Sequence, residues 1–498
     1  MMQSTTTQAP TPNAPPADVA RIAGRGTIYI SAAKLWFILS GFGIQLALTR
    51  LMSTEQYGLY LVVIGLISII NAFVVTGTSQ TVSKYISQDE SRADSVKAKA
   101  LKMQAAVGGS LSLGFFLLAP SIASYLNDAR LTNYLRLAAL ITLSYSFYAV
   151  FTGYFNGQKK FLTQAALDAT YSTLKLVCIV LLVWAGFGVA GGVGGFALAA
   201  MSVLTLSAII AGKGKRTGEV RVKELFAFQF YLLAFTLVLN LLQKVDLILV
   251  KALSSPDAIV ASANAGFYGA AINIANVTYQ VIISVTFVIF PLVSQAAFAN
   301  DRKLTQTYIA NTMRYTLMIM ALLATLFSAN AASVLHVIYP DQYQAGSGAL
   351  AWVAFGMLAF GLIYVLTTMI SASGRPTVSL IIGVITLAAS AILNALLIPR
   401  AGLTGAGLAT TCAMFIGAGV GIGYLLTRFG ALIPPLSLAR IAGCSAIIYA
   451  LSLAYTPASK PLIIVKLAAL GLVYIIVLIA SREVGRDELR LLQRVMKK

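Results

Sequence analysis

The sequence has too little charge to cover a protein surface in water. Only 10% of its 498 residues are charged and 58% are hydrophobic, whereas a soluble domain carries roughly a quarter charged residues. Apolar runs of about 20 residues, the length that crosses a bilayer, follow one another along the chain. The composition therefore excludes a soluble protein and predicts an all-α polytopic membrane protein.

Histidine, cysteine and catalytic motifs are scarce as well. The single histidine, His336, leaves no room for a histidine-based metal cluster or catalytic triad. The three cysteines, Cys178, Cys412 and Cys444, lie inside apolar runs at spacings that fit neither a disulfide nor a metal site, so we expect buried structural thiols. Asp-x-Asp, GxGxxG and Walker-type segments are absent from the sequence. We therefore expect no metal, no cofactor and no ATP hydrolysis.

The apolar runs predict about fourteen transmembrane helices. Their expected ranges are 26–49, 57–79, 101–120, 131–154, 163–185, 188–211, 226–252, 266–291, 309–330, 345–372, 377–398, 401–427, 437–455 and 461–481. The tightest junctions between spans are expected near Gly186, Gly374 and Gly402.

The basic residues indicate how these spans are oriented. The net charge is +20, but lysines and arginines lie between apolar runs instead of forming a stripe interleaved with aromatics. Contacts with anionic membrane lipids are therefore expected, and contacts with nucleic acid are not. If the N-terminus is cytoplasmic, most basic residues fall in inside connections, which places both termini in the cytoplasm. The outside connections then hold only Arg50, Arg130, Arg136, Lys251, Arg400 and Lys460.

Short patterns recur in the same order in the two halves of the chain, which indicates an internal repeat of six helices. An even number of helices makes both copies enter the membrane in the same direction, as in transporters with parallel repeats. Two such bundles can rock about a central cavity. The recurring pairs are Tyr57-Gly58 with Tyr268-Gly269, Val82-Ser83 with Val293-Ser294, Asn156-Gly157-Gln158 with Ser373-Gly374-Arg375, and Gly188-Val-Ala-Gly191 with Gly402-Leu-Thr-Gly405.

The repeat and the charge pattern together predict the domain organisation. Two six-helix lobes, 21–211 and 226–428, are joined by a basic cytoplasmic linker, 212–225, and followed by two additional transmembrane helices, 429–481. Residues 1–20 are rich in Thr, Pro and Ala and are expected to form a disordered cytoplasmic tail. Residues 482–498 are expected to form a basic amphipathic helix on the anionic inner leaflet.

Several segments resemble the signatures of bacterial oligosaccharide flippases. They are Leu51-Met-Ser-Thr-Glu-Gln-Tyr57-Gly58-Leu-Tyr60, Lys244-Val-Asp246-Leu-Ile-Leu followed by Gly266-Phe-Tyr268-Gly269-Ala-Ala, Ser373-Gly-Arg375-Pro376, and the stretch from Asn394 to Ala406. The similarity covers roughly residues 22 to 430 and is typical of the polysaccharide-exporter (Wzx-like) branch of the superfamily that also contains MATE drug exporters and MurJ-type lipid II flippases. Two features depart from that pattern: the segment 254–264 is longer than usual, and fourteen spans exceed the commoner twelve.

The resemblance implies a V-shaped pair of lobes that flips undecaprenyl-diphosphate-linked oligosaccharides across the bacterial inner membrane. It also implies partnership with a polysaccharide polymerase and with chain-length machinery during synthesis of surface polysaccharide. No enzymatic activity of the chain itself is expected.

Charged residues inside the spans are candidates for cargo binding, because each costs about 2.5–3.5 kcal/mol by insertion scales and needs a partner or a wet cavity. Lys175 and Lys244 either bind the diphosphate or belong to structural ion pairs, and Lys34 either meets an anionic headgroup or snorkels to the interface. For Asp168 and Asp246 we favour structural ion pairing.

Uncharged polar residues form a stripe on the eighth span. Asn273, Asn276 and Gln280 recur at spacings of three and four residues, so they share one face of the helix. This face either lines a cavity for sugars or forms interhelical hydrogen bonds. Arg136, Arg314 and Lys466 lie near helix ends and are expected to snorkel.

Two other functions compete with a flippase. A membrane polysaccharide polymerase or ligase would need a sizeable external loop with catalytic residues, and the predicted outside connections are short and nearly uncharged. A MATE-like exporter of cationic small molecules would need unpaired carboxylates in its cavity. The predicted spans hold more lysines than carboxylates, which favours an anionic cargo.

Overall fold

The computed structural model describes residues 17–214, 236–282, 293–295, 299, 301–430, 433–457 and 459–483. Every regular element within these ranges is a helix, which confirms the predicted all-α class. Most of the predicted N-terminal tail (1–16), of the linker (215–225) and of the C-terminal tail helix (484–498) lies outside the described residues.

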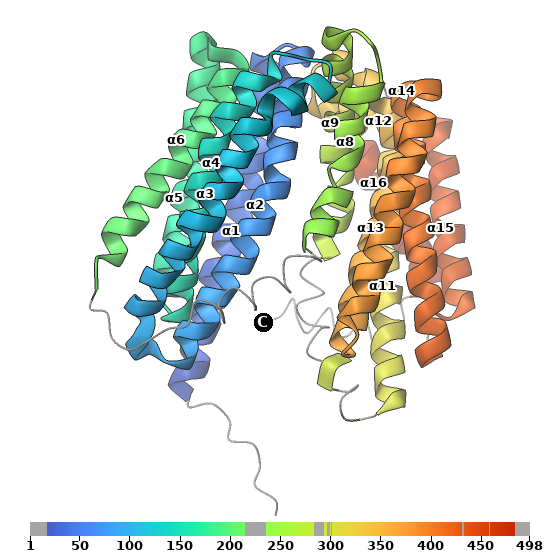
Figure 1. Ribbon diagram of the computed structural model, residues 1–498. Helices are drawn as coiled ribbons and strands as arrows, with labels where there is room; N and C mark the ends of the chain where they lie inside the picture. The colour runs from blue at the N-terminus through green and yellow to red at the C-terminus, as the bar shows by residue number, and fades with distance from the viewer. Residues whose placement is uncertain are drawn as a thin grey trace, which may run out of the picture.

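The first half of the chain forms one bundle, the N-lobe (Figure 1). Its central helix is α4 (Leu131–Gly157), which packs against several neighbours. Their apolar faces enclose a common core, and the outward faces carry exposed hydrophobic side chains that suit lipid contact. The other helices of the N-lobe are α1 (Ala17–Leu51), α2 (Thr54–Gln88), α3 (Ala93–Tyr125), α5 (Phe161–Leu182) and α6 (Gly188–Ala211).

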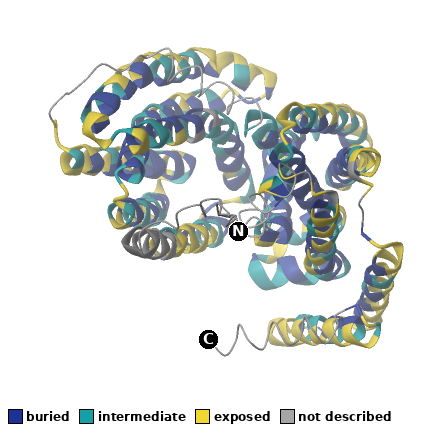
Figure 2. Ribbon diagram, turned by 90° about the horizontal axis from the view of Figure 1, so that it is seen from below, coloured by how far each residue is buried: buried dark blue, intermediate teal, exposed yellow. Residues whose placement is uncertain are grey.

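The second half forms the C-lobe around α13 (Ser347–Ala372), of which 78% of the most apolar stretch is buried. Two further helices, α15 (Pro435–Ala454) and α16 (Lys460–Ala480), lie at the margin of this lobe with exposed outward faces (Figure 2). The remaining elements are α8 (Val245–Leu253), α9 (Ala258–Ala275), α11 (Arg302–Ala329), α12 (Ala331–Ile338), the short helix η3 (Asp341–Gly346) and α14 (Pro376–Phe429).

Two long helical stretches are hairpins of two spans each. Gly188, after the turn η2 (Val183–Phe187), has φ 50° and ψ −131°, and Gly402 inside α14 has φ 55° and ψ −134°. A positive φ of this kind favours glycine and reverses the helix direction. The two arms of the second hairpin are joined by Asn394, whose Nδ2 donates to Thr410 Oγ1 at 3.3 Å. The nearly identical backbone angles at the two glycines support the repeat.

The fourteen predicted spans are recovered once these hairpins are divided. Eleven helices among the described residues are apolar and long enough to cross a membrane. Dividing two of them at the hairpin glycines and adding the helix that ends at Leu253 accounts for all fourteen. The count that the sequence predicts is therefore confirmed, although α12 is an additional short helix that it does not predict.

The repeat also extends to the turns between the fourth and fifth spans of each lobe, in a register that differs from the predicted one. Lys159 N donates to Asn156 O at 3.0 Å, and Gly374 N donates to Ser371 O at 3.0 Å. The next amide in each turn bonds a carbonyl five residues earlier, at Phe155 and at Ile370. Lys159 is therefore equivalent to Gly374, two residues away from the pairing of the sequence motifs.

Two predicted spans differ from the observed helices. The predicted span 226–252 is interrupted at Gln243 and Lys244, and α8 starts only at Val245. The eighth span starts at Ala258 instead of 266, because the Asp257 carboxylate accepts hydrogen bonds from two backbone amides of the first turn. Most of the segment predicted as a long connection is thus the beginning of α9. A second interruption lies at Asn276, after which the helix resumes to residue 282.

The end of α16 is fixed to the C-lobe by a buried carboxylate. Glu483 pairs with Arg314 of α11, whose Nε lies 2.6 Å from Oε1, and with Arg440 of α15 at 3.4 Å. Arg314 is thus an ion-pair partner and does not snorkel as predicted, because the chain returns to this end of α11 after α16. Lys466 donates to the carbonyl of Ser452 at 2.8 Å.

Among the described residues, the two lobes meet at one end. They pack together where α1 ends and α2 begins, through α2 and α9, and their ribbons diverge towards the opposite end (Figure 1). The result is the V-shaped pair of lobes that the resemblance implies.

Candidate functional site

Lys244 lies at the interruption before α8, on the side of the C-lobe that faces α2. A methyl group added at Gly65 of α2 would lie 3.9 Å from Lys244 Cδ and 3.7 Å from Leu247, so the N-lobe backbone is close by. The Lys244 side chain is half-buried, and in the described part of the chain its ammonium has no hydrogen bond and no ion pair within 4 Å. This lysine therefore lies between the lobes with donors that remain available.

The interruption of the seventh span lies beside that of the eighth. Tyr279, three residues after Asn276, donates its hydroxyl hydrogen bond to Gln243 Oε1 at 3.3 Å. Asn276 and Gln280 are half-buried on the same stretch of chain. The Tyr279–Gln243 hydrogen bond thus joins the interruption that contains Lys244 to the segment that carries two residues of the predicted polar stripe, Asn276 and Gln280. Interrupted helices near the middle of a membrane are frequent binding sites in transporters.

Asn273, the third member of the stripe, has a different environment. Its Nδ2 donates to the hydroxyl of Tyr57 at 3.2 Å, and Tyr57 donates to Gln45 Oε1 at 2.6 Å. Tyr57 and Gln45 belong to the N-lobe, so Asn273 forms an interhelical hydrogen bond between the lobes. Of the two roles that the sequence leaves open for this stripe, Asn273 fills the second.

Asp246 is buried inside the C-lobe, with 1% of its surface exposed. It accepts hydrogen bonds from Tyr268 at 3.0 Å and from Thr410 at 3.4 Å, instead of forming an ion pair with another helix. Asn394 donates to the same Thr410, and its amide oxygen has no partner within the described ranges. Carboxylate, amide and hydroxyl oxygens are the types of ligand that hard cations take.

Lys175 lies in an aromatic environment of the N-lobe. Its Nζ lies 4.1 Å from the ring centroid of Phe196 and 5.8 Å from that of Phe37. Asp168 forms no ion pair with Lys175 in the described structure. It accepts a hydrogen bond from Tyr148 at 2.7 Å and interacts electrostatically with the exposed Lys34. The structure places Lys175 in the N-lobe and Lys244 in the C-lobe.

A buried ion pair that the sequence does not single out joins the lobes. Lys251 of α8 contacts Asp128 in the α3–α4 connection, with Nζ 3.0 Å from Oδ2. Asp128 is also bonded by Arg130, which pairs in turn with Glu55. Burial raises the pKa of the Asp128 carboxyl, but hydrogen bonds from Arg130 and Lys251 outweigh it and hold that pKa below its usual range. The sequence contains a signal for it, since Arg130 and Lys251 are two of the six basic residues in the predicted outside connections.

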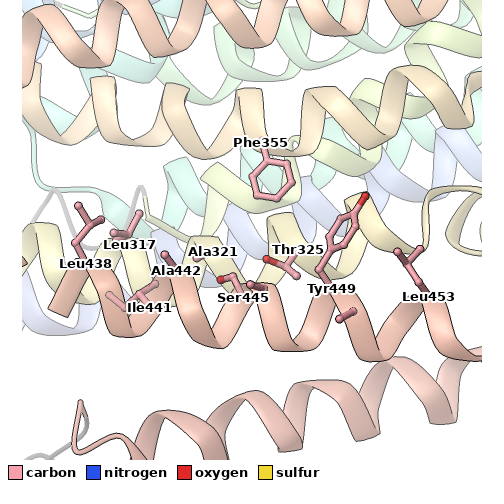
Figure 3. Close-up of a pocket in the computed structure, with 12 residues that line it drawn as sticks. Leu317, Ala321, Thr325, Phe355, Leu438, Ile441, Ala442, Ser445, Tyr449 and Leu453 are labelled. Atoms are coloured by element: carbon pink, nitrogen blue, oxygen red, sulfur yellow. The ribbon is translucent and has the colours of Figure 1, made fainter. Parts of the chain in front are cut away.

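An apolar pocket lies on the C-lobe between α11, α13 and α15 (Figure 3). It has a volume of 570 Å³ and is lined mainly by hydrocarbon side chains such as Phe355. The hydroxyls of Thr325 and Ser445 lie in its wall without a hydrogen-bond partner among the described residues. A pocket of this composition within the membrane suits a hydrocarbon chain.

Comparisons with known proteins agree with this architecture. Residues 47–347 match the family model of the polysaccharide biosynthesis proteins. The uncharacterized membrane protein YabM of Bacillus subtilis (strain 168) is 26% identical over 385 residues, which are 70% of each chain. The uncharacterized membrane protein MJ1068 of Methanocaldococcus jannaschii is 24% identical over 198 residues, 39% of this chain and 38% of the relative. The chain thus spans well under two thirds of that archaeal relative.

Two kinds of solved transporter share the fold. The lipid II flippase MurJ in an inward closed conformation aligns with a TM-score of 0.74 and 16% identity, over 92% of this chain and 100% of MurJ. An inward-facing multidrug resistance transporter of the MATE family aligns with a TM-score of 0.63 and 15% identity, over 79% and 94%. These likenesses show that the chain shares the fold of these transporters. With a family model that covers more than half of its length, this chain belongs to the polysaccharide biosynthesis protein family.

Proposed function

We propose that the protein flips a lipid-linked oligosaccharide, an undecaprenyl-diphosphate-linked repeat unit, across the bacterial inner membrane by alternating access. The observation that carries the proposal is Lys244, a cation between two lobes whose described residues meet at one end. A lysine at a helix interruption inside a membrane is costly unless it has a counter-charge. A diphosphate that enters between the lobes would supply that charge.

The surroundings of Lys244 fit a diphosphate joined to a sugar. Lys244 precedes the first turn of α8, whose amino end adds a partial positive charge that attracts anions. Asn276 and Gln280 provide amide donors and acceptors, which suit the hydroxyl groups of a glycan. Charge and sugar recognition would thus come from adjacent parts of the same lobe.

The apolar pocket between α11, α13 and α15 supports a lipid-linked cargo. Its hydrocarbon lining is compatible with a polyprenyl chain that stays in the membrane while the polar part of the cargo moves between the lobes. The family to which the chain belongs supports a role in polysaccharide synthesis. We extend the proposal to termini in the cytoplasm and to a polysaccharide polymerase and chain-length machinery as partners.

Lipid analysis of cells that lack the gene tests the proposal. We expect an undecaprenyl-diphosphate oligosaccharide to accumulate and surface polysaccharide to disappear, as detected by mass spectrometry and by glycan staining. Normal lipids and normal polysaccharide would contradict the proposal.

Variants of Lys244 connect the phenotype to the site. We expect Lys244→Gln to lower export about tenfold or more, because a hydrogen bond to a charged group contributes roughly 1.5–3 kcal/mol, and Lys244→Arg to retain most of it. Lys466→Gln is the matched control, since Lys466 is also a half-buried lysine in a span but lies in α16. Equal export by Lys244→Gln and the control, at equal membrane abundance, would remove Lys244 from the mechanism.

Ion-coupled export of small molecules is the second candidate function. The observation in its favour is the Asp246 network, whose unpartnered Asn394 oxygen offers a ligand to a cation. New sensitivity of the deletion strain to cationic drugs, with unchanged polysaccharide, would favour this function over the flippase.

A further inference from the structure

The end at which the lobes meet is closed by one buried ion pair. The side chains of Lys251 and Asp128 are 0% and 2% exposed, and they come from different lobes. Rocking of the lobes to the opposite state must separate them. Separating a buried ion pair usually costs much free energy, because each charge is left without its partner.

Each of these charges, however, has further partners within its own lobe. Lys251 Nζ also donates to the carbonyl of Ala258 at 3.0 Å and to Ser262 Oγ at 2.8 Å. Asp128 accepts hydrogen bonds from the Arg130 guanidinium at 2.9 Å on both carboxylate oxygens. After separation both charges would keep these contacts, so the contact between the lobes can break and form again without orphaning either group.

The repeat supplies a weaker counterpart on the other side of the interface. Arg50 ends α1 as Lys251 ends α8, and Arg50 Nη2 donates to the carbonyl of Ile338 at 3.2 Å. Ile338 ends α12, in the connection between the third and fourth spans of the C-lobe, and Asp128 lies in the corresponding connection of the N-lobe. The first span of each lobe thus reaches the same connection of the opposite lobe, but the Arg50 contact is exposed and its acceptor is neutral.

We propose that Asp128 and Lys251 form a reversible latch that holds this end of the transporter closed, with Arg50 and Ile338 as its weak counterpart. The latch lies next to a close approach of the two lobe backbones. There, a methyl group at Gly58 would overlap the carbonyl oxygen of Ser262. In the predicted orientation this end faces the outside. The latch therefore sets the fraction of molecules that are open to the cytoplasm, whatever cargo the protein carries.

The distance between two spin labels tests the latch in the full-length protein in lipid nanodiscs. Ala129 beside Asp128 and the exposed Ile259 at the start of α9 are replaced by labelled cysteines. The native cysteines of this background, Cys178, Cys412 and Cys444, are replaced by alanine. Double electron–electron resonance then reports the populations of short and long distances, which represent the closed and open states of this end.

Loss of either charge is expected to open this end. Asp128→Asn and Lys251→Met should each shift the ratio of long to short distances by roughly tenfold, a typical size of coupling between two states. Arg50→Gln, the counterpart control, should shift it by less than about twofold, as expected for an exposed contact. Each variant is compared at equal monodispersity and thermal stability.

Unchanged distance distributions in both latch variants, or an equal shift in Arg50→Gln, would overturn the latch. Where one of the two neutral variants does not fold, the other decides, because each removes one charge of the same pair. Lys251→Arg and Asp128→Glu keep the opposite charges and should retain the closed state as controls. The distances are recorded without cargo, so a failure of the flippase proposal leaves this result unaffected.

Discussion

In each lobe the second span carries a buried Tyr-Gly pair whose tyrosine bonds a polar side chain of the first span. Tyr57 donates to Gln45 at 2.6 Å in the N-lobe, and Tyr268 donates to Asp246 at 3.0 Å in the C-lobe. Both tyrosines are completely buried. The partner is neutral in one lobe and a carboxylate in the other.

The second bond of each tyrosine differs as well. Tyr57 accepts a hydrogen bond from Asn273 of the opposite lobe, whereas Tyr268 lies beside Thr410 of its own lobe. The same backbone feature thus contributes to lobe contact on one side and to an internal polar network on the other. The repeat therefore determines where the spans turn and meet, while the side chains at equivalent positions determine which lobe holds charge.

Substitution of the glycines in the two Tyr-Gly pairs should produce the largest difference in export. A methyl group at Gly58 would overlap a backbone carbonyl of the opposite lobe, but one at Gly269 would overlap only the end of the Leu61 side chain, which can rotate. We expect Gly58→Ala to lower export about tenfold or more, because the added methyl group would displace the two lobe backbones from each other, and small displacements far from a functional site can have large effects. Gly269→Ala should stay near the parent. Export by complemented deletion cells, normalised to membrane abundance, measures both, and equal losses would mean that the two glycines are interchangeable.

The next effect concerns the N-lobe lysine. We expect Lys175→Gln to reduce export several-fold, less than Lys244→Gln, while thermal stability changes little, because a cation–π contact contributes only about 0.5–2 kcal/mol. Export assays and thermal unfolding of the purified protein distinguish the roles. Full export with a lowered unfolding temperature would make Lys175 a purely structural residue.

The partners of the two tyrosines should differ in their effect on stability. Asp246→Ala leaves the hydroxyls of Tyr268 and Thr410 buried without their acceptor, which costs about 1–3 kcal/mol. Gln45→Ala removes one interhelical hydrogen bond, with an expected cost of roughly 0.6 kcal/mol. Thermal unfolding in detergent ranks the two variants. A larger loss of stability for Gln45→Ala would mean that the neutral partner, and not the carboxylate, contributes more to stability.

The smallest effect tests a feature that the N-lobe lacks among the described helices, the attachment of α15 and α16. Burial raises the pKa of Glu483, but hydrogen bonds from Ser437 and Arg314 outweigh it, so the net pKa lies below the usual range. A lowered folded-state pKa means that Glu483 stabilises the fold above the ordinary carboxyl pKa, and that this contribution is lost as the pH falls through the lowered value.

Unfolding temperatures across the acid range measure this contribution. The parent should be slightly more stable than Glu483→Gln at neutral pH, and the difference should disappear at the acid end of the range. A difference that persists unchanged in acid would mean that the carboxylate charge is not what attaches these helices.

The length of the apolar runs and the positions of the glycines are sufficient to predict the number of spans and the hairpin turns. Hydrocarbon thickness fixes the length of a transmembrane helix, so the predicted number of spans and the hairpin turns near Gly186 and Gly402 agree with the structure. The interruption at Gln243 and Lys244 was missed because neither glycine nor proline marks it. The early start of α9 was missed because the Asp257 cap acts through two backbone amides and does not change hydropathy.

The site was less predictable than the fold because it depends on contacts between distant residues. Its charge alone makes Lys244 a candidate for cargo binding, but its position opposite α2 follows from the packing of the two lobes. Asp128 and Lys251 are 123 residues apart in the chain, and no local pattern connects them. Their common signal is the rarity of basic residues in the predicted outside connections, since Arg50, Arg130 and Lys251 all take part in contacts at the end where the lobes meet.

The glycine hairpins have a consequence for the biogenesis of the protein. In the predicted orientation, both turns must be translocated across the membrane during synthesis. The turn at Val183–Phe187 contains no charged residue, so α5 and α6 can enter the bilayer together as a preformed pair. The turn at Gly402 follows the exposed Arg400, a residue type that adds about 2.5–3.5 kcal/mol at the centre of the membrane. Insertion of the second hairpin should therefore be the slower step and the one that depends more on the insertion machinery.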